Sequence, residues 1–73
     1  MLTLPVRNRI QEIRLERKIS QVKMAEDLNV TRQTINAIEK ERYNPSLELT
    51  LKIIEYFQLP IEAIFYLEKG DAE

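Results

Sequence analysis

The feature of this sequence that most limits its fold is a three-residue turn between two short amphipathic segments, residues 21–28 and 32–40. The apolar faces of the two segments consist of Met24, Ala25, Leu28, Ile35 and Ile38. Apolar residues at three- and four-residue spacing predict helices with one buried side. Asn29 begins the turn, and asparagine tolerates the left-handed conformation that ends many helices. The spacing therefore predicts two short helices packed against each other.

Capping residues support the two predicted helices. Ser20 and Thr31 stand directly before them, where a hydroxyl can accept a hydrogen bond from a free N–H of the first turn. Ala25 is small enough to let the helices approach closely, and Val30 fills the turn between them. Two helices joined in this way form a helix-turn-helix unit at about residues 21–40.

The flanking sequence predicts three more helices. Val6, Ile10 and Ile13 indicate a first helix over residues 6–17. Ser46 caps a fourth helix over residues 47–57, whose predicted inward residues are Leu47, Leu51, Ile54 and Phe57. Pro60 starts a short fifth helix through Ile64. The expected fold is a single all-α domain of five helices spanning residues 1–73, with a small β-pairing of Leu2–Leu4 with Phe65–Leu67.

Composition excludes several classes of function. The chain has 73 residues with no cysteine and no histidine, which rules out zinc sites, catalytic triads and thiolate chemistry. We therefore expect neither an enzyme nor a bound metal or cofactor. Glu55 and Glu62 interrupt the most apolar stretch, so no membrane span is expected. The Met1–Pro5 stretch is too short for a secretory signal, and we expect the protein to be cytoplasmic.

The net charge of −1 hides an uneven distribution. Residues 1–44 contain nine basic and six acidic side chains, a balance of +3, whereas residues 45–73 contain two basic and six acidic ones, a balance of −4. This asymmetry suggests that the first part faces an anionic partner, although uneven surface salt bridges would produce it equally well.

Several short motifs resemble those of the phage-repressor and Cro-like (Xre-type) helix-turn-helix family of transcriptional regulators. They are Ile19–Gln21, Met24–Ala25, Val30–Ile35, Ile38–Glu39 and Tyr43–Leu47. The resemblance covers about residues 8–67. It implies a domain whose third helix enters the DNA major groove, usually as a homodimer on an approximately palindromic operator. The chain departs from the family pattern at Asn29, where glycine is common, and at Lys40–Glu41, where Asn-Gly is common.

The family places base-contacting side chains at the start of the third helix. Helical spacing puts polar residues but no acid on the outward face of this helix. The predicted base contacts are Arg32, Gln33, Asn36 and Ala37. Arginine can bond guanine and glutamine can bond adenine through paired hydrogen bonds. Arg32 could instead hold a phosphate, and any of these side chains could simply be solvated.

Phosphate contacts are expected around the same helix and in the loop that follows it. The candidates are Gln21, Thr31, Thr34, Lys40, Arg42, Tyr43 and Asn44. Gln21 could serve only as a helix cap, and the ring of Tyr43 could pack on the domain.

Two further sets of residues have expected structural roles. Arg14 and Glu39 occupy positions at which the family forms an ion pair, so the resemblance implies a scaffold pair. The apolar residues of the segment at about 60–69 are expected to form a homodimer interface or, alternatively, to close the monomer core. They are Ile61, Ile64, Phe65, Tyr66 and Leu67.

The sequence leaves two functions to distinguish. The first is a sequence-specific regulator of transcription, most simply a repressor that occupies an operator as a homodimer. The second is an antitoxin-type module that binds DNA and also neutralises a partner protein. Both require double-stranded DNA as a partner.

Overall fold

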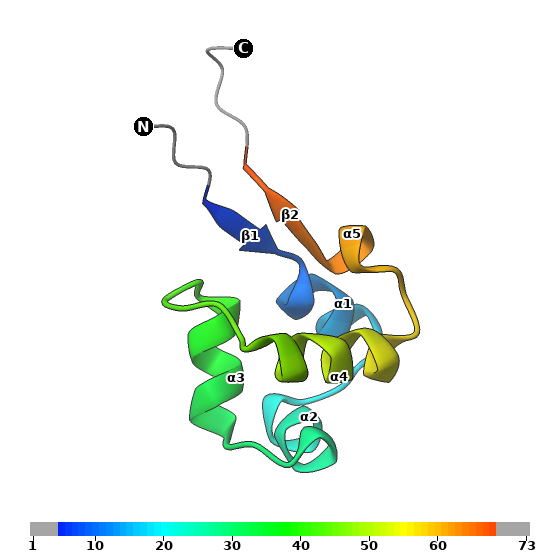
Figure 1. The fold of residues 1–73 in the computed structure, drawn as a ribbon. Helices are drawn as coiled ribbons and strands as arrows, with labels where there is room; N and C mark the ends of the chain where they lie inside the picture. The colour runs from blue at the N-terminus through cyan, green and yellow to red at the C-terminus, as the bar shows by residue number, and fades with distance from the viewer. Residues whose placement is uncertain (1–4, 69–73) are drawn as a thin grey trace.

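The computed structural model describes residues 5–68, which form five helices and a two-stranded antiparallel sheet (Figure 1). The sheet lies at the end of the molecule opposite α2. The elements in chain order are β1 (Val6–Asn8), α1 (Ile10–Glu16), α2 (Gln21–Leu28), α3 (Arg32–Glu39), α4 (Leu47–Phe57), α5 (Ile61–Ile64) and β2 (Phe65–Leu67). The five helices and the terminal β-pairing confirm the predicted fold class.

Three of the helices begin at hydroxyl caps, as the sequence predicts. The side chains of Ser20, Thr31 and Ser46 accept hydrogen bonds from the backbone N–H groups three residues later, at 2.9, 3.1 and 3.1 Å. Each such cap stabilises its helix by about 1 kcal/mol. Asn29 ends α2 with φ 61°, in the left-handed region. These caps fix the length and direction of the two helices on either side of the turn.

The core is formed by apolar side chains from all five helices. It contains Ile10, Ile13, Met24, Ala25, Leu28, Ile35, Ile38, Ile53, Phe57 and Ile64. Burial of these side chains is the main force that holds the short helices together.

The predicted inward face of α4 was partly wrong. Leu47 and Leu51 are 75% and 57% exposed, whereas Ile53 and Phe57 are completely buried. Apolar residues occur around most of this helix, and the partly buried Leu49, Ile54 and Tyr56 also pack against the core. The sequence of this helix therefore contains two apolar faces of similar spacing, and packing against the other helices determines which face is buried.

The N-terminal segment also differs from the prediction. Val6 belongs to β1 and not to the first helix, and β1 pairs with β2 in the register Val6↔Leu67, Arg7↔Tyr66 and Asn8↔Phe65. The predicted partner of β2, Leu2–Leu4, lies outside the described residues. α1 begins at Ile10 because residues 6–8 pair with β2, and Oδ1 of Asn8 accepts a hydrogen bond from the N–H of Ile10 at 3.1 Å. No helix within residues 5–68 is long and apolar enough to cross a membrane.

Candidate nucleic-acid interface

The outward face of α3 is the central feature of the candidate site. Ile35 and Ile38 are buried and fix the helix against the core. The opposite side of the helix borders an open hollow of about 480 Å³, lined by Arg32, Gln33, Asn36, Ala37 and Arg42. The structure thus brings together all four side chains predicted to contact bases, and it adds an arginine from the loop after the helix.

The basic side chains of residues 5–44 fall into two groups. Five of them are held by other parts of the protein. Three form ion pairs: Arg7 with Glu41 and Glu68, Arg14 with Glu39, and Lys23 with Asp27. The guanidinium of Arg9 lies over the ring of Tyr66. Arg17 donates a hydrogen bond to the carbonyl of Phe57. The second group forms no ion pair and no aromatic contact within residues 5–68. It consists of Lys18, Arg32, Lys40 and Arg42.

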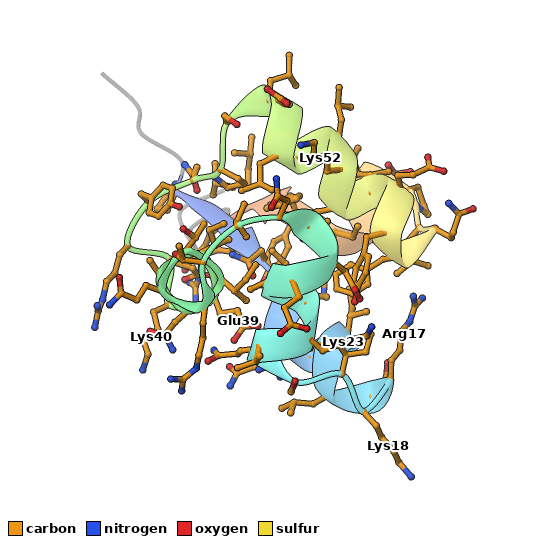
Figure 2. The ribbon with its side chains drawn as sticks, turned by 90° about the horizontal axis from the view of Figure 1, so that it is seen from below. Arg17, Lys18, Lys23, Glu39, Lys40 and Lys52 are labelled. Carbon is orange, nitrogen blue, oxygen red and sulfur yellow. The ribbon has the colours of Figure 1, made fainter. Side chains whose placement is uncertain are left out.

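Three of the four cations in this second group lie on α3 or directly after it. Figure 2 shows Lys40 extending outward at the end of α3, with Lys18 on the far side of α2 in the same view. The two acids of this region, Glu39 and Glu41, face arginines, so their charge is offset. The surface around α3 is therefore more positive than the net charge of the chain suggests, and it suits an anionic partner.

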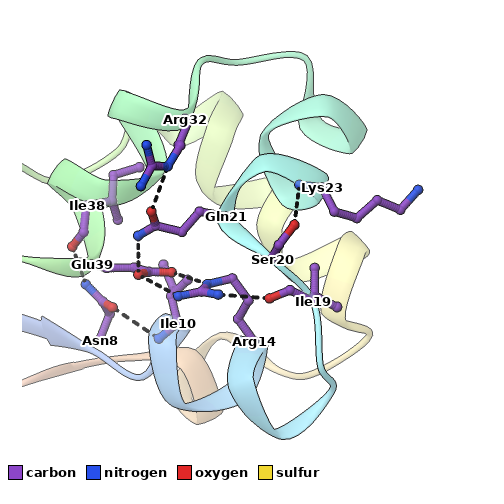
Figure 3. Close-up of polar contacts among 10 residues, drawn as sticks. All are labelled: Asn8, Ile10, Arg14, Ile19, Ser20, Gln21, Lys23, Arg32, Ile38 and Glu39. Atoms are coloured by element: carbon purple, nitrogen blue, oxygen red, sulfur yellow. Dashed lines mark hydrogen bonds and ion pairs between the residues drawn. The ribbon is translucent and has the colours of Figure 1, made fainter.

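A buried ion pair supports α3 from behind (Figure 3). Arg14 Nε lies 2.6 Å from Oε2 of Glu39, and Arg14 Nη2 donates to Oε1 at 3.1 Å. The two side chains are 7% and 2% exposed. Arg14 also donates from Nη1 to the carbonyl of Ile19 at 2.8 Å. This bidentate ion pair joins α1 to the end of α3 and fixes the orientation of α3 on the core.

Gln21 extends this network to the outward face of α3 (Figure 3). Its Nε2 donates to Oε1 of Glu39 at 3.0 Å, and its Oε1 accepts a bond from Nε of Arg32 at 3.3 Å. The bond to Nε leaves both terminal nitrogens of the Arg32 guanidinium available. Gln21 was predicted to contact phosphate, and in the structure both ends of its amide have partners within the protein.

The loop after α3 is held by the N-terminal strand. Glu41 adopts φ 61°, a left-handed conformation that glycine adopts more easily. Its Oε2 accepts a bond from the backbone N–H of Asn8 at 3.1 Å, and Nδ2 of Asn8 donates to the carbonyl of Ile38 at 3.0 Å. Arg7 Nε lies 2.8 Å from Oε1 of Glu41 as an ion pair. The hydrogen bond to Glu68 and then the contact with Glu41 raise the pKa of Arg7.

Asn8 and Glu41 are thus two residues that sequence reasoning missed. The signal for Asn8 was an asparagine two residues before the apolar Ile10, because an asparagine side chain can bond the backbone two residues further along the chain. Glu41 gives no such signal, because its role depends on a strand more than thirty residues away in the sequence.

The remaining predicted phosphate contacts lie at the start of α3 or at its end and in the loop that follows, and none of them lines the hollow. Thr31 and Thr34 share a hydrogen bond of 3.0 Å between their hydroxyls at the start of α3. Lys40, Tyr43 and Asn44 are exposed in the loop that follows. Tyr43 is 46% exposed and is absent from the apolar core cluster.

The segment predicted to form a dimer interface is divided between the core and the surface. Ile64 is completely buried in the monomer, and Phe65 packs partly against the core. Ile61, Tyr66 and Leu67 are exposed. The predicted alternative, closure of the monomer core, therefore accounts for two of the five residues.

A separate polar cluster joins α2 to α4. The hydroxyl of Tyr56 donates to Oδ2 of Asp27 at 2.7 Å, and Lys23 lies 3.1 Å from Oδ1. The hydrogen bond from Tyr56, followed by that from Lys23, lowers the pKa of Asp27. Burial, followed by the bond to Asp27, raises the pKa of Tyr56 to about 12. Within residues 5–68, no group of three acidic side chains is placed to hold a metal ion.

Comparison with known proteins agrees with this geometry. A family model described as helix-turn-helix matches residues 10–64. The chain belongs to the Cro-like helix-turn-helix family of transcriptional regulators. It is 45% identical over 64 residues to an HTH-type transcriptional regulator of Bacillus subtilis, a match that covers 88% of this chain and 97% of the relative. A regulator of the same type from Methanocaldococcus jannaschii is 43% identical over 66 residues, covering 90% of this chain and all of that one.

One further relative and one solved structure are also similar to this chain. The immunity repressor protein of Bacillus phage phi105 is 39% identical over 61 residues, which is 84% of this chain and 42% of the repressor. The crystal structure of a candidate DNA-binding protein from Bacteroides fragilis superposes with a TM-score of 0.75 at 21% identity, covering 84% of this chain and 98% of that one. At this identity the second match shows the fold alone. As a member of the helix-turn-helix family, the chain is a transcriptional regulator that binds DNA.

Proposed function

We propose that this regulator is a sequence-specific repressor that binds an approximately palindromic operator as a homodimer, with α3 in the major groove. The observation that carries the proposal is the hollow on α3. Arg32, Gln33 and Asn36 all present groups that can bond base edges, and Ala37 leaves room for a thymine methyl. The likeness to a phage immunity repressor supports the repressor role.

Phosphate contacts would surround this surface. Lys40, Tyr43 and Asn44 are exposed beyond the end of α3, while Thr31 and Thr34 flank its start. Gln21 can approach a phosphate with the N–H that remains free on its amide. Such contacts set the orientation of the protein on the duplex without reading the sequence.

The dimer surface that we propose consists of Ile61, Tyr66 and Leu67. These exposed apolar side chains come from α5 and β2. Both elements belong to residues 45–73, the part of the sequence with a net negative charge. A two-fold dimer would place its two α3 helices one DNA turn apart, about 34 Å. Sedimentation equilibrium should show a dimer at micromolar concentration that Tyr66→Ala together with Leu67→Ser dissociates. A monomeric wild-type protein that binds single half-sites would contradict this part of the proposal.

The roles of the side chains are tested by comparing two variants on a duplex selected from random sequence. Gln33→Ala should reduce the preference for one base pair in each half-site, because it removes a base contact. Lys40→Ala should weaken binding to all sequences alike, because it removes a phosphate contact. The slope of log K against log salt concentration should fall by about 0.9 for each subunit that binds. Equal effects of the two variants on all duplexes would refute this assignment.

We favour the repressor over the antitoxin-type module because the relatives named above are regulators and a repressor. Purification from the native host distinguishes the two functions. A stoichiometric partner protein whose toxicity is suppressed by this chain would establish the second function, and a chain that purifies alone with its operator would support the first.

A further inference from the structure

We infer that Arg42, which lies outside α3, reads a base pair in the major groove and is a specificity-determining residue. From the sequence, Arg42 was predicted to be a phosphate contact in the loop after α3. The inference rests on the proposed function and assigns one more residue to base recognition.

The position of Arg42 is the first reason. Arg42 lines the same hollow as Arg32, Gln33, Asn36 and Ala37. Lys40, two residues earlier in the chain, is exposed but does not line this hollow. A side chain at the hollow faces the space that the edges of the base pairs would occupy if α3 enters the groove.

The second reason is that the backbone at Arg42 is fixed. Its N–H donates to the carbonyl of Ala37 at 3.0 Å, and the N–H of Glu41 donates to the carbonyl of Ile38 at 2.9 Å. Glu41 reverses the chain direction with its left-handed conformation, and Asn8 holds the side chain of Glu41. Arg42 therefore continues the outward surface of α3, and little backbone flexibility has to be lost on binding.

The third reason is chemical. Within residues 5–68, the Arg42 side chain forms no hydrogen bond and no ion pair, so the whole guanidinium is available. A guanidinium can donate two parallel hydrogen bonds to O6 and N7 of guanine. Arg32 opens α3, and Arg42 is anchored close to the other end of the helix. We therefore expect two different G·C pairs in each half-site, one that depends on Arg32 and one that depends on Arg42.

The experiment begins with the duplex that the wild-type chain selects from random sequence. Affinities are then measured for every single base-pair change in one half-site, with the wild type, Arg42→Ala and the control Lys40→Ala, at several salt concentrations. Circular dichroism checks that each variant is folded.

We expect the wild type to discriminate against substitution of one G·C pair by about 5- to 150-fold, the usual range for a paired arginine contact. Arg42→Ala should lose this discrimination at that pair alone and should keep its salt slope. Lys40→Ala should keep all discrimination, and the slope of log K against log salt concentration should fall by about 0.9 for each subunit, or about 1.8 for the dimer.

Two results would contradict the inference, and they have different meanings. If Arg42→Ala keeps the full sequence preference and loses salt slope as Lys40→Ala does, Arg42 is a phosphate contact and the proposed function stands. If the wild type enriches no sequence at all, the proposed sequence-specific function is wrong, and with it the role of Arg42.

Discussion

The ion pair between Arg14 and Glu39 allows a sharp test of how the fold holds α3. In Glu39→Gln the buried guanidinium of Arg14 keeps its charge but loses its counter-ion, with the side chain 7% exposed. Removing one partner of a buried pair costs about 3–5 kcal/mol. A domain of this size has a free energy of unfolding of about 4–11 kcal/mol, so the substitution removes a large part of the total stability.

The measurement is urea denaturation followed by circular dichroism, with thermal unfolding as a second readout. The expected loss corresponds to a fall in Tm of about 12–40 °C, because a domain of this length loses about 4–8 °C per kcal/mol. The matched control is Glu48→Gln, which breaks the exposed pair with Lys52, whose side chains are 80% and 51% exposed. This control should lose less than about 1 kcal/mol.

Replacing both members of the buried pair tests the explanation itself. Arg14→Met combined with Glu39→Met leaves no isolated charge, so this variant should recover most of the stability that Glu39→Gln loses. A loss below about 1 kcal/mol in Glu39→Gln, equal to that of Glu48→Gln, would refute the reasoning that burial makes this pair important.

Three further predictions follow from the polar contacts and the backbone. Gln21→Ala should weaken discrimination at the base pair read by Arg32, because it removes the bond to Nε; unchanged discrimination in the single base-pair series would argue against this positioning role. The pKa of Tyr56 is about 12 in the folded chain and about 10 when unfolded, so the folded state binds more protons between these values and stability should fall as pH rises from about 10 to about 12. Tyr56→Phe should abolish this fall in urea titrations, and an unchanged pH profile would contradict it. Lys18 has φ 60°, and Lys18→Gly should raise the free energy of unfolding by about 0.5–1 kcal/mol, whereas a loss of stability would show that no strain is stored there.

Local signals in the sequence predicted the part of the fold that lies closest to the site. Ser20, Thr31 and Ser46 cap their helices as predicted, because a hydroxyl cap requires contacts within only three residues. Asn29 adopts the left-handed turn for an equally local reason. Helical periodicity predicted that Gln33, Asn36 and Ala37 share one surface of α3, and the structure places all three at one hollow. Arg32, which the family resemblance added, also lines this hollow, whereas Lys40, which periodicity placed on the same face, does not.

Features that depend on distant contacts could not be predicted in this way. The sequence around Val6 has apolar spacing compatible with a helix, and only pairing with β2 makes it a strand. The buried face of α4 is chosen by the helices that surround it, so Ile53 is buried and Leu51 is exposed. The tether from Asn8 to Glu41 joins residues that no local pattern connects.

The proposed function requires that the surface of α3 reads DNA sequence. Its most direct test is the ratio of the affinities of the wild-type chain for its selected duplex and for a duplex of the same base composition in scrambled order, measured at one physiological salt concentration. We expect a ratio of about 10³ or more, as specific DNA-binding proteins show. A ratio near one would refute sequence reading by α3, because binding would then depend on phosphate contacts alone.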